Sequence, residues 1–115
     1  MKSVQSPRRA LCAIFVALAL AGCAQQRIRD EATSHLREGN FEVAIQSLQS
    51  GVDQFPESAL LRAGLTAARS EAITRLITQV SQARAQGQFD DADTGIRRGV
   101  ALEPGNPRLL AYSLI

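Results

Sequence analysis

The stretch that decides the fold is Gly39-Asn40-Phe41-Glu42-Val43-Ala44, which returns 48 residues later as Gly87-Gln88-Phe89-Asp90-Asp91-Ala92. Both copies read Gly-x-Phe-acid-x-Ala. Each copy is followed at the same offsets by a glycine and then a proline, namely Gly51 and Pro56 in the first and Gly99 and Pro104 in the second. An internal repeat of constant spacing indicates that the chain stacks copies of one supersecondary unit.

Each copy of the repeat predicts a turn between two helices. Glycine readily adopts the left-handed conformation that follows a helix, so Gly39 and Gly87 are predicted to lie in the turns. Asn40 suits the N-cap of the next helix, and the acidic residue after the phenylalanine is favoured by the helix dipole. Pro56 and Pro104 are predicted to end the units, because the residue before a proline is pushed out of the helical region.

Apolar residues at intervals of three to four predict helices throughout the chain after residue 26. The predicted helical ranges are 27–38, 41–53, 57–86, 89–101 and 107–115. The last of these starts with Asn106 as N-cap and Pro107 as first helical residue. Only Gly64 interrupts the range 57–86. We interpret this range as one long helix, with two coaxial pieces jointed at Gly64 as the alternative.

Small residues in the repeat predict close helix packing. Ala32 on the first helix and Ala44 on the second let the two backbones approach, and Phe41 and Leu48 are predicted to fill the groove between the helices. The predicted packing and turn residues of the two copies are Gly39, Phe41, Ala44, Gly51, Pro56, Gly87, Phe89, Ala92, Gly99 and Pro104.

The first copy resembles the tetratricopeptide repeat family. The residues at the family's motif positions are Gly39, Phe41, Ala44, Gly51 and Pro56. The resemblance implies an all-α fold with about two helical hairpins, at 27–56 and 73–104, joined by a linking helix at 57–86. It also implies a groove that binds a peptide or a helix of a protein partner. Ile28 and His35 depart from the family's aromatic positions, so the first helix is divergent.

The N-terminal segment reads as an export signal. Lys2, Arg8 and Arg9 precede an unbroken apolar run over residues 10–21. A basic start followed by about a dozen apolar residues is typical of a secretory signal peptide. The run is shorter than the roughly 20 residues of a membrane-spanning helix, so we do not expect it to span the membrane.

The run ends in Leu20-Ala21-Gly22-Cys23, which resembles the lipobox of bacterial lipoproteins. The resemblance implies cleavage before Cys23, a diacylglycerol on its sulfur and a fatty acid such as palmitate on its amine. Residues 1–22 are then the signal, 23–26 the acylated cysteine with a short tether, and 27–115 the helical domain. Ala24 in place of aspartate implies the periplasmic face of the outer membrane. An ordinary signal peptide with a chance cysteine is the alternative.

The amino-acid composition narrows the functions that the protein can have. Residues 23–115 carry ten arginines, no lysine and eleven acidic residues, and this near-neutral balance argues against a nucleic-acid partner. With Cys12 in the signal and Cys23 acylated, no thiol is left for a disulfide or a metal site. One histidine, His35, and no phosphate-binding loop or metalloprotease motif predict no enzyme activity and no cofactor. The acidic residues 90, 91 and 93 do not have calcium-loop spacing.

The sequence thus predicts a lipid-anchored, helical-repeat adaptor that binds protein partners. The order of its segments resembles the N-terminal region of secretins, the outer-membrane channels of type II secretion and type IV pilus systems. This resemblance implies secretion-system components as partners. The alternatives are a free-standing scaffold lipoprotein and a truncated, non-functional remnant of a secretin. With about two repeats and an apolar last helix, we expect marginal folding alone or self-association.

Overall fold

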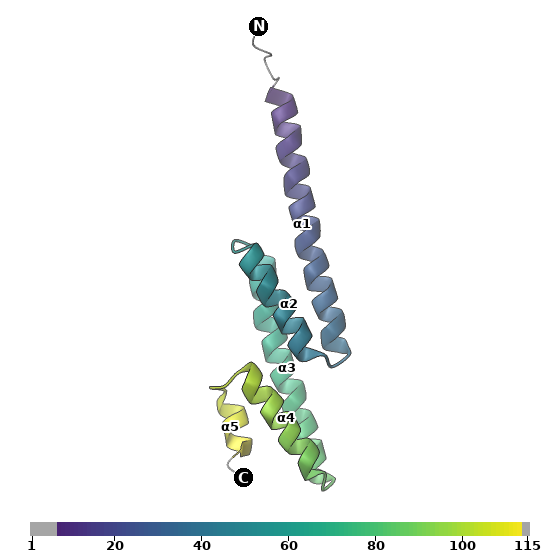
Figure 1. Cartoon of the computed structure of the whole chain (residues 1–115), viewed down its shortest axis with the longest axis vertical. Helices are drawn as coiled ribbons and strands as arrows, with labels where there is room; N and C mark the ends of the chain where they lie inside the picture. The colour runs from purple at the N-terminus through teal and green to yellow at the C-terminus, as the bar shows by residue number, and fades with distance from the viewer. Residues whose placement is uncertain (1–6, 114–115) are drawn as a thin grey trace.

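The computed structural model describes residues 7–113, and these residues form five α-helices and no strand. The all-α class predicted from the sequence is confirmed. The molecule is elongated, with extents of 81 × 24 × 15 Å, and the first half of α1 projects beyond the other helices (Figure 1). The helices are α1 (Pro7–Arg37), α2 (Phe41–Gln54), α3 (Ala59–Ala85), α4 (Phe89–Leu102) and α5 (Pro107–Ser113).

The helix α3 is the axis of the fold. Its first half packs against α1 and α2, and its second half packs against α4 (Figure 1). Side chains from both halves are buried, among them Leu61 and Leu65 in the first half and Val80 and Ala83 in the second. The predicted continuity of this helix is confirmed, and Gly64 lies within it without a joint.

The repeat of 48 residues is also a structural repeat. Both α2 and α4 have 14 residues, and both follow a glycine of positive φ, 83° at Gly39 and 75° at Gly87. Both end in the same way, because the backbone N–H after the helix donates to the carbonyl of Gly51 or Gly99. The predicted turn role of the two glycines is therefore confirmed. We call residues 28–65 unit 1 and residues 76–113 unit 2.

The repeat extends into the helix that follows each pair. The Ser58 hydroxyl accepts a hydrogen bond from the N–H of Leu61 at 3.2 Å, and the Asn106 side-chain oxygen accepts one from the N–H of Leu109 at 3.4 Å. Both leucines are buried, with exposed fractions of 0% and 1%. The start of α3 therefore has the role in unit 1 that α5 has in unit 2.

Two of the predicted packing glycines lie at close helix contacts. A Cβ atom on Gly51 would lie 3.1 Å from side-chain atoms of Ile28 and Leu61, and one on Gly99 would lie 2.8 Å from Leu109. Ala44 and Ala92 are buried as predicted. The prolines have a different place: Pro56 and Pro104 are exposed, so they end helices but do not pack in the core.

The prediction for Phe89 was wrong. Phe41 is fully buried, but Phe89 exposes 65% of its surface. Phe41 lies under the guanidinium of Arg75 on the second half of α3, 5.1 Å from the ring centroid. In unit 2 no described segment takes that place: the seven-residue α5 packs against α4 through Leu109 at Gly99 and through Tyr112, and Phe89 stays exposed.

The N-terminal helix is longer than predicted. The range expected at 27–38 is the end of a single helix of 31 residues, and the expected tether at 23–26 is helical. The cause is a lack of helix breakers: after Pro7 the only weak position is Gly22, which costs about 1 kcal/mol relative to alanine. By length and composition alone, α1 could cross a membrane, although a signal sequence passes the same test. The apolar run was expected to be too short to span a membrane. The 31-residue helix that contains it is long and apolar enough by that test.

Gly95 provides a test of packing in unit 2. A Cβ atom there would lie 2.7 Å from Cγ2 of Val80, whose side chain is buried and rotationally stiff in a helix. We expect Gly95→Ala to destabilise the protein by about 1 kcal/mol. Overpacking costs about 1–3 kcal/mol, and this exceeds the about 0.5–1 kcal/mol by which alanine stabilises a helix relative to glycine. Urea unfolding of the full chain in detergent, followed by circular dichroism, measures the difference.

Gly64→Ala is the matched control for that experiment. Its new Cβ would meet only Cδ2 of Leu48, at 3.4 Å, which is ordinary van der Waals contact. We therefore expect Gly64→Ala to stabilise the protein by about 0.5–1 kcal/mol, because alanine is favoured over glycine inside a helix. Equal stabilisation by both substitutions would show that α3 and α4 are not in close contact at Gly95.

Candidate functional site

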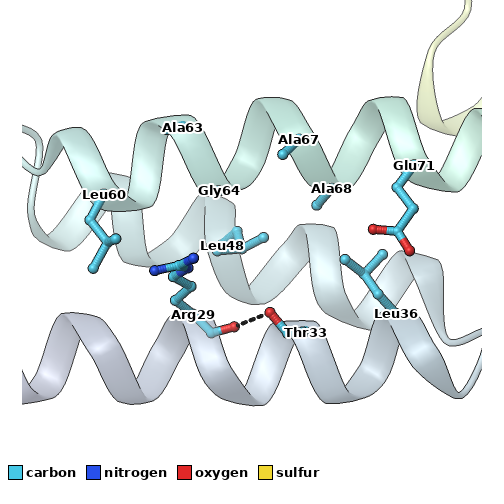
Figure 2. Close-up of a pocket in the computed structure, with 10 residues that line it drawn as sticks. All are labelled: Arg29, Thr33, Leu36, Leu48, Leu60, Ala63, Gly64, Ala67, Ala68 and Glu71. Carbon is cyan, nitrogen blue, oxygen red and sulfur yellow. Dashed lines mark hydrogen bonds between the residues drawn. The ribbon is translucent and has the colours of Figure 1, made fainter.

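A groove runs between α1 and the first half of α3, with a cavity volume of about 330 Å³ (Figure 2). It stays open because α3 presents residues with little or no side chain at Ala63, Gly64 and Ala67. The buried leucines Leu36 and Leu48 form its floor. We call it the Gly64 groove, and its lining residues are Arg29, Thr33, Leu36, Leu48, Leu60, Ala63, Gly64, Ala67, Ala68 and Glu71.

Polar side chains flank the apolar floor of the groove. Arg29 and Thr33 extend from α1 toward α3, and the Thr33 hydroxyl donates to the backbone carbonyl of Arg29 at 2.9 Å (Figure 2). Glu71 lies at the other end, and its carboxylate is 4.0 Å from the guanidinium of Arg75. An apolar floor between a cation and an anion suits an apolar side chain carried on a polar peptide backbone.

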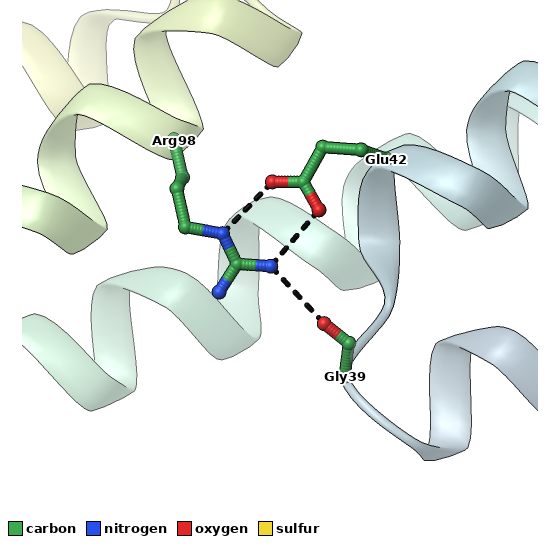
Figure 3. A network of polar contacts seen from close by, with 3 residues as sticks. All are labelled: Gly39, Glu42 and Arg98. Carbon is green, nitrogen blue, oxygen red and sulfur yellow. Dashed lines mark hydrogen bonds and ion pairs between the residues drawn. The ribbon is translucent and has the colours of Figure 1, made fainter.

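A second polar arrangement joins the two units (Figure 3). The guanidinium of Arg98 on α4 donates to both carboxylate oxygens of Glu42, at 2.8 and 2.9 Å, and to the carbonyl of Gly39 at 3.1 Å. The same guanidinium lies 5.3 Å from the ring centroid of Phe41. Bidentate pairs of this kind fix geometry as well as adding energy. Arg98 therefore fastens unit 2 to the turn that opens α2.

The pKa values of the pair follow from this contact. The hydrogen bonds from Arg98 are the largest cause that lowers the pKa of Glu42 below its ordinary value, and the same hydrogen bonds raise the pKa of Arg98. From the sequence, Glu42 was interpreted as a partner of the helix dipole alone. Their contact across 56 residues has no local signal in the sequence.

The lowered pKa of Glu42 predicts a pH dependence. The stabilisation is present above the unfolded carboxyl pKa, about 4.3, and is lost as the pH falls through the lower folded value. We expect Glu42→Gln to lower stability at pH 7 by up to about 1 kcal/mol, because exposed ion pairs contribute about 0.2–1 kcal/mol. The difference from the wild type should shrink as the pH is lowered below the folded pKa. Thermal melts across this range measure it.

Glu57→Gln is the control for the pH series. Glu57 is an exposed carboxylate in the turn before α3, so we expect its replacement to change stability at pH 7 by less than the replacement of Glu42 does. A Glu42→Gln profile that parallels the wild type at every pH would contradict the assigned ion pair.

The predicted lipidation site lies at the boundary between two parts of α1. Cys23 is exposed and free. Before it, the apolar side chains of the predicted signal expose more than half of their surface, with Phe15 at 70% and Leu20 at 66%. Just after it, Gln25 accepts a hydrogen bond of 2.8 Å from the Ser58 hydroxyl. A continuous exposed apolar surface of this kind suits lipid contact.

The remaining titratable groups of the described helices lie apart from the groove and from the Arg98 contact. Among residues 7–113 no cluster of histidine, cysteine, aspartate and glutamate could hold a metal ion. The acidic residues 90, 91 and 93 are exposed at the start of α4. His35 is half-buried near the end of α1, and its Nδ1 has no hydrogen-bond partner in the described part of the chain.

The structure brings together most of the predicted packing residues of unit 1 and places Cys23 beyond their core. The sequence predicted a groove but did not identify its walls. Three small residues at 63, 64 and 67 on one helix face are the signal that could have located it. No protein-family model, curated protein or solved structure matches this chain.

Proposed function

We propose that this protein is a lipid-anchored lipoprotein of the periplasm that binds a protein partner through the Gly64 groove. One observation carries the proposal: the exposed apolar part of α1 runs up to Leu20-Ala21-Gly22-Cys23, immediately before the part of the same helix that packs against the other helices. Acyl chains on Cys23 would anchor this body, because each buried CH₂ contributes about 0.8 kcal/mol.

Loss of the signal would leave the body intact. The core of unit 1 begins at Ile28, so residues 7–22, the described part of the predicted signal, contribute no side chain to it. The hydrogen bond between Gln25 and Ser58 would hold the shortened α1 against the start of α3. At the proposed cleavage point, Gly22 is the weakest helix-forming residue and Ala21 has a small side chain. Both features favour local unwinding of the helix, which would let the backbone enter a peptidase cleft.

We infer that the two helix pairs are tetratricopeptide-like hairpins. Support comes from the turn at Gly39, the buried Phe41 and Ala44, and the close approach at Gly51, which all occupy the motif positions. Stacked helix pairs present a groove, and here residues of α1 and α3 line the Gly64 groove, with Leu48 of α2 in its floor. The protein would therefore act by binding a peptide or helix, without catalysis.

The proposed setting is the periplasmic face of the outer membrane, in a secretion or pilus assembly. Ala24 after Cys23 and the secretin-like order of segments favour it. A free-standing scaffold of the outer membrane would use the same anchor and the same groove.

Site-specific photo-crosslinking in bacterial cells tests the binding role. A photoreactive amino acid replaces Ala67 in the groove or, as a matched control, Ala101 on α4; both alanines are exposed. We expect one discrete protein adduct from position 67 and none from position 101. No adduct at 67, or the same adduct from both positions, would contradict binding through the groove.

A further inference from the structure

The two units differ at the position of Gly64, which lines the groove of unit 1. By the 48-residue register, Gly64 in the first half of α3 corresponds to Tyr112 in α5. The correspondence is structural, because α3 and α5 begin at equivalent residues after the equivalent N-caps Ser58 and Asn106. Unit 2 therefore carries an aromatic side chain where unit 1 has none.

Tyr112 occupies a defined seat in unit 2. Its hydroxyl lies 2.7 Å from the Ser81 hydroxyl, and its ring centroid lies 5.3 Å from the guanidinium carbon of Arg84. Arg84 also donates to the backbone carbonyl of Tyr112 at 2.7 Å. The ring packs against the buried cluster that contains Val80 and Ile96. The seat thus consists of a hydroxyl, a cation and an apolar floor.

Residues of the same register form the Gly64 groove in unit 1. Thr33 corresponds to Ser81, Leu36 to Arg84, and Leu48 to Ile96. The hydroxyl is therefore kept, and so is one apolar residue of the floor, since Leu48 takes the place of Ile96. The cation of the second seat is replaced by Leu36, while Arg29 adds a guanidinium at another edge of the groove.

We propose that the Gly64 groove binds the side chain of a tyrosine presented by a protein partner. This inference rests on the proposed binding function and names the chemistry of its ligand. The phenol would donate to the Thr33 hydroxyl, which retains lone pairs while it donates to the Arg29 carbonyl. The ring would lie on Leu36 and Leu48, and Tyr112 is the template within the same chain.

N-acetyl-tyrosinamide is the probe, and N-acetyl-leucinamide is its matched control. We expect the tyrosine probe to shift the amide NMR signals of Thr33, Gly64 and Ala67 in the full chain in detergent. A single side chain should bind with a dissociation constant on the order of millimolar. Equal shifts with the leucine probe would show a groove that only selects apolar groups, and would overturn the proposal.

Gly64→Tyr provides a second, independent test. The new Cβ fits, since it would lie 3.4 Å from Leu48, and the ring should fill the groove as Tyr112 fills its own seat. We expect this variant to lose the probe-induced shifts and to melt at a higher temperature than Gly64→Ala. Unchanged shifts in Gly64→Tyr, with the fold retained, would overturn the proposal.

The results of the probe experiments can be told apart from the result of the crosslinking experiment. Probe binding with no crosslink at position 67 in cells would contradict the proposed function while the tyrosine seat stands. A crosslink at position 67 without tyrosine-selective shifts would contradict the seat and leave the binding function.

Discussion

Replacement of Phe41 by alanine should lower the free energy of unfolding by about 3–5 kcal/mol, whereas Phe89→Ala should change it by less than about 0.5 kcal/mol. The two residues occupy the same place in the repeat. Phe41 is fully buried between helices, with the guanidinium groups of Arg75 and Arg98 5.1 and 5.3 Å from its ring centroid. Phe89 exposes 65% of its surface and loses little when it is truncated.

The expected loss at Phe41 is a large part of the total stability, because domains of this size are stable by about 5–15 kcal/mol. Urea unfolding of the two variants beside the wild type, all as full chains in detergent, measures both values. Similar losses for the two substitutions would show that Phe89 is covered in solution. Near-zero losses for both would contradict the core of unit 1.

Replacement of Cys23 by alanine should abolish incorporation of labelled palmitate and leave the signal uncleaved. The sulfur is the group that accepts the lipid in the proposed reaction, and alanine offers no nucleophile. The uncleaved chain would keep the exposed apolar part of α1, which is long enough to hold it in a membrane. Loss of label and of processing, and not simple membrane association, are therefore the informative results.

Cys12→Ala is the matched control for that labelling experiment. Both cysteines are exposed on α1, but Cys12 lies within the segment that cleavage would remove. We expect this variant to be labelled and processed like the wild type. Label that persists in Cys23→Ala, or that disappears in Cys12→Ala, would contradict the assignment of the lipid to Cys23.

Features with a local cause could be predicted from the sequence. The turns at Gly39 and Gly87 depend on the conformation of one residue, and both glycines have positive φ. The start of α5 depends on Asn106, whose side chain accepts a hydrogen bond from the backbone two residues on. The continuity of α3 through Gly64 follows from a long run of good helix formers, in which one glycine is tolerated.

Features that depend on distant neighbours could not be predicted. Phe41 and Phe89 have the same local sequence, and only the helices around them decide which one is buried. The contact between Glu42 and Arg98 joins exposed residues 56 positions apart, and exposed charges carry no periodic signal. The length of α1 was missed because the predicted signal and the first helix of unit 1 are both helix-forming and no breaker separates them.

The sequence predicted that a groove exists but did not predict which residues line it. The repeat implied that a groove would exist, but its walls depend on which face of α3 turns toward α1. Ala63, Gly64 and Ala67 fall on that face, and Tyr112 shows what a larger residue does at the equivalent position. The two copies together therefore show how the groove would be filled, which neither copy shows alone.

The intact mass of the protein purified from bacterial membranes tests the central claim most directly. The account predicts a chain that begins at Cys23 and carries acyl chains on the sulfur and on the new amine. A mass of 12.4 kDa, that of the unmodified 115-residue chain, would contradict it. A chain cleaved at another position, with Cys23 unmodified, would contradict it equally.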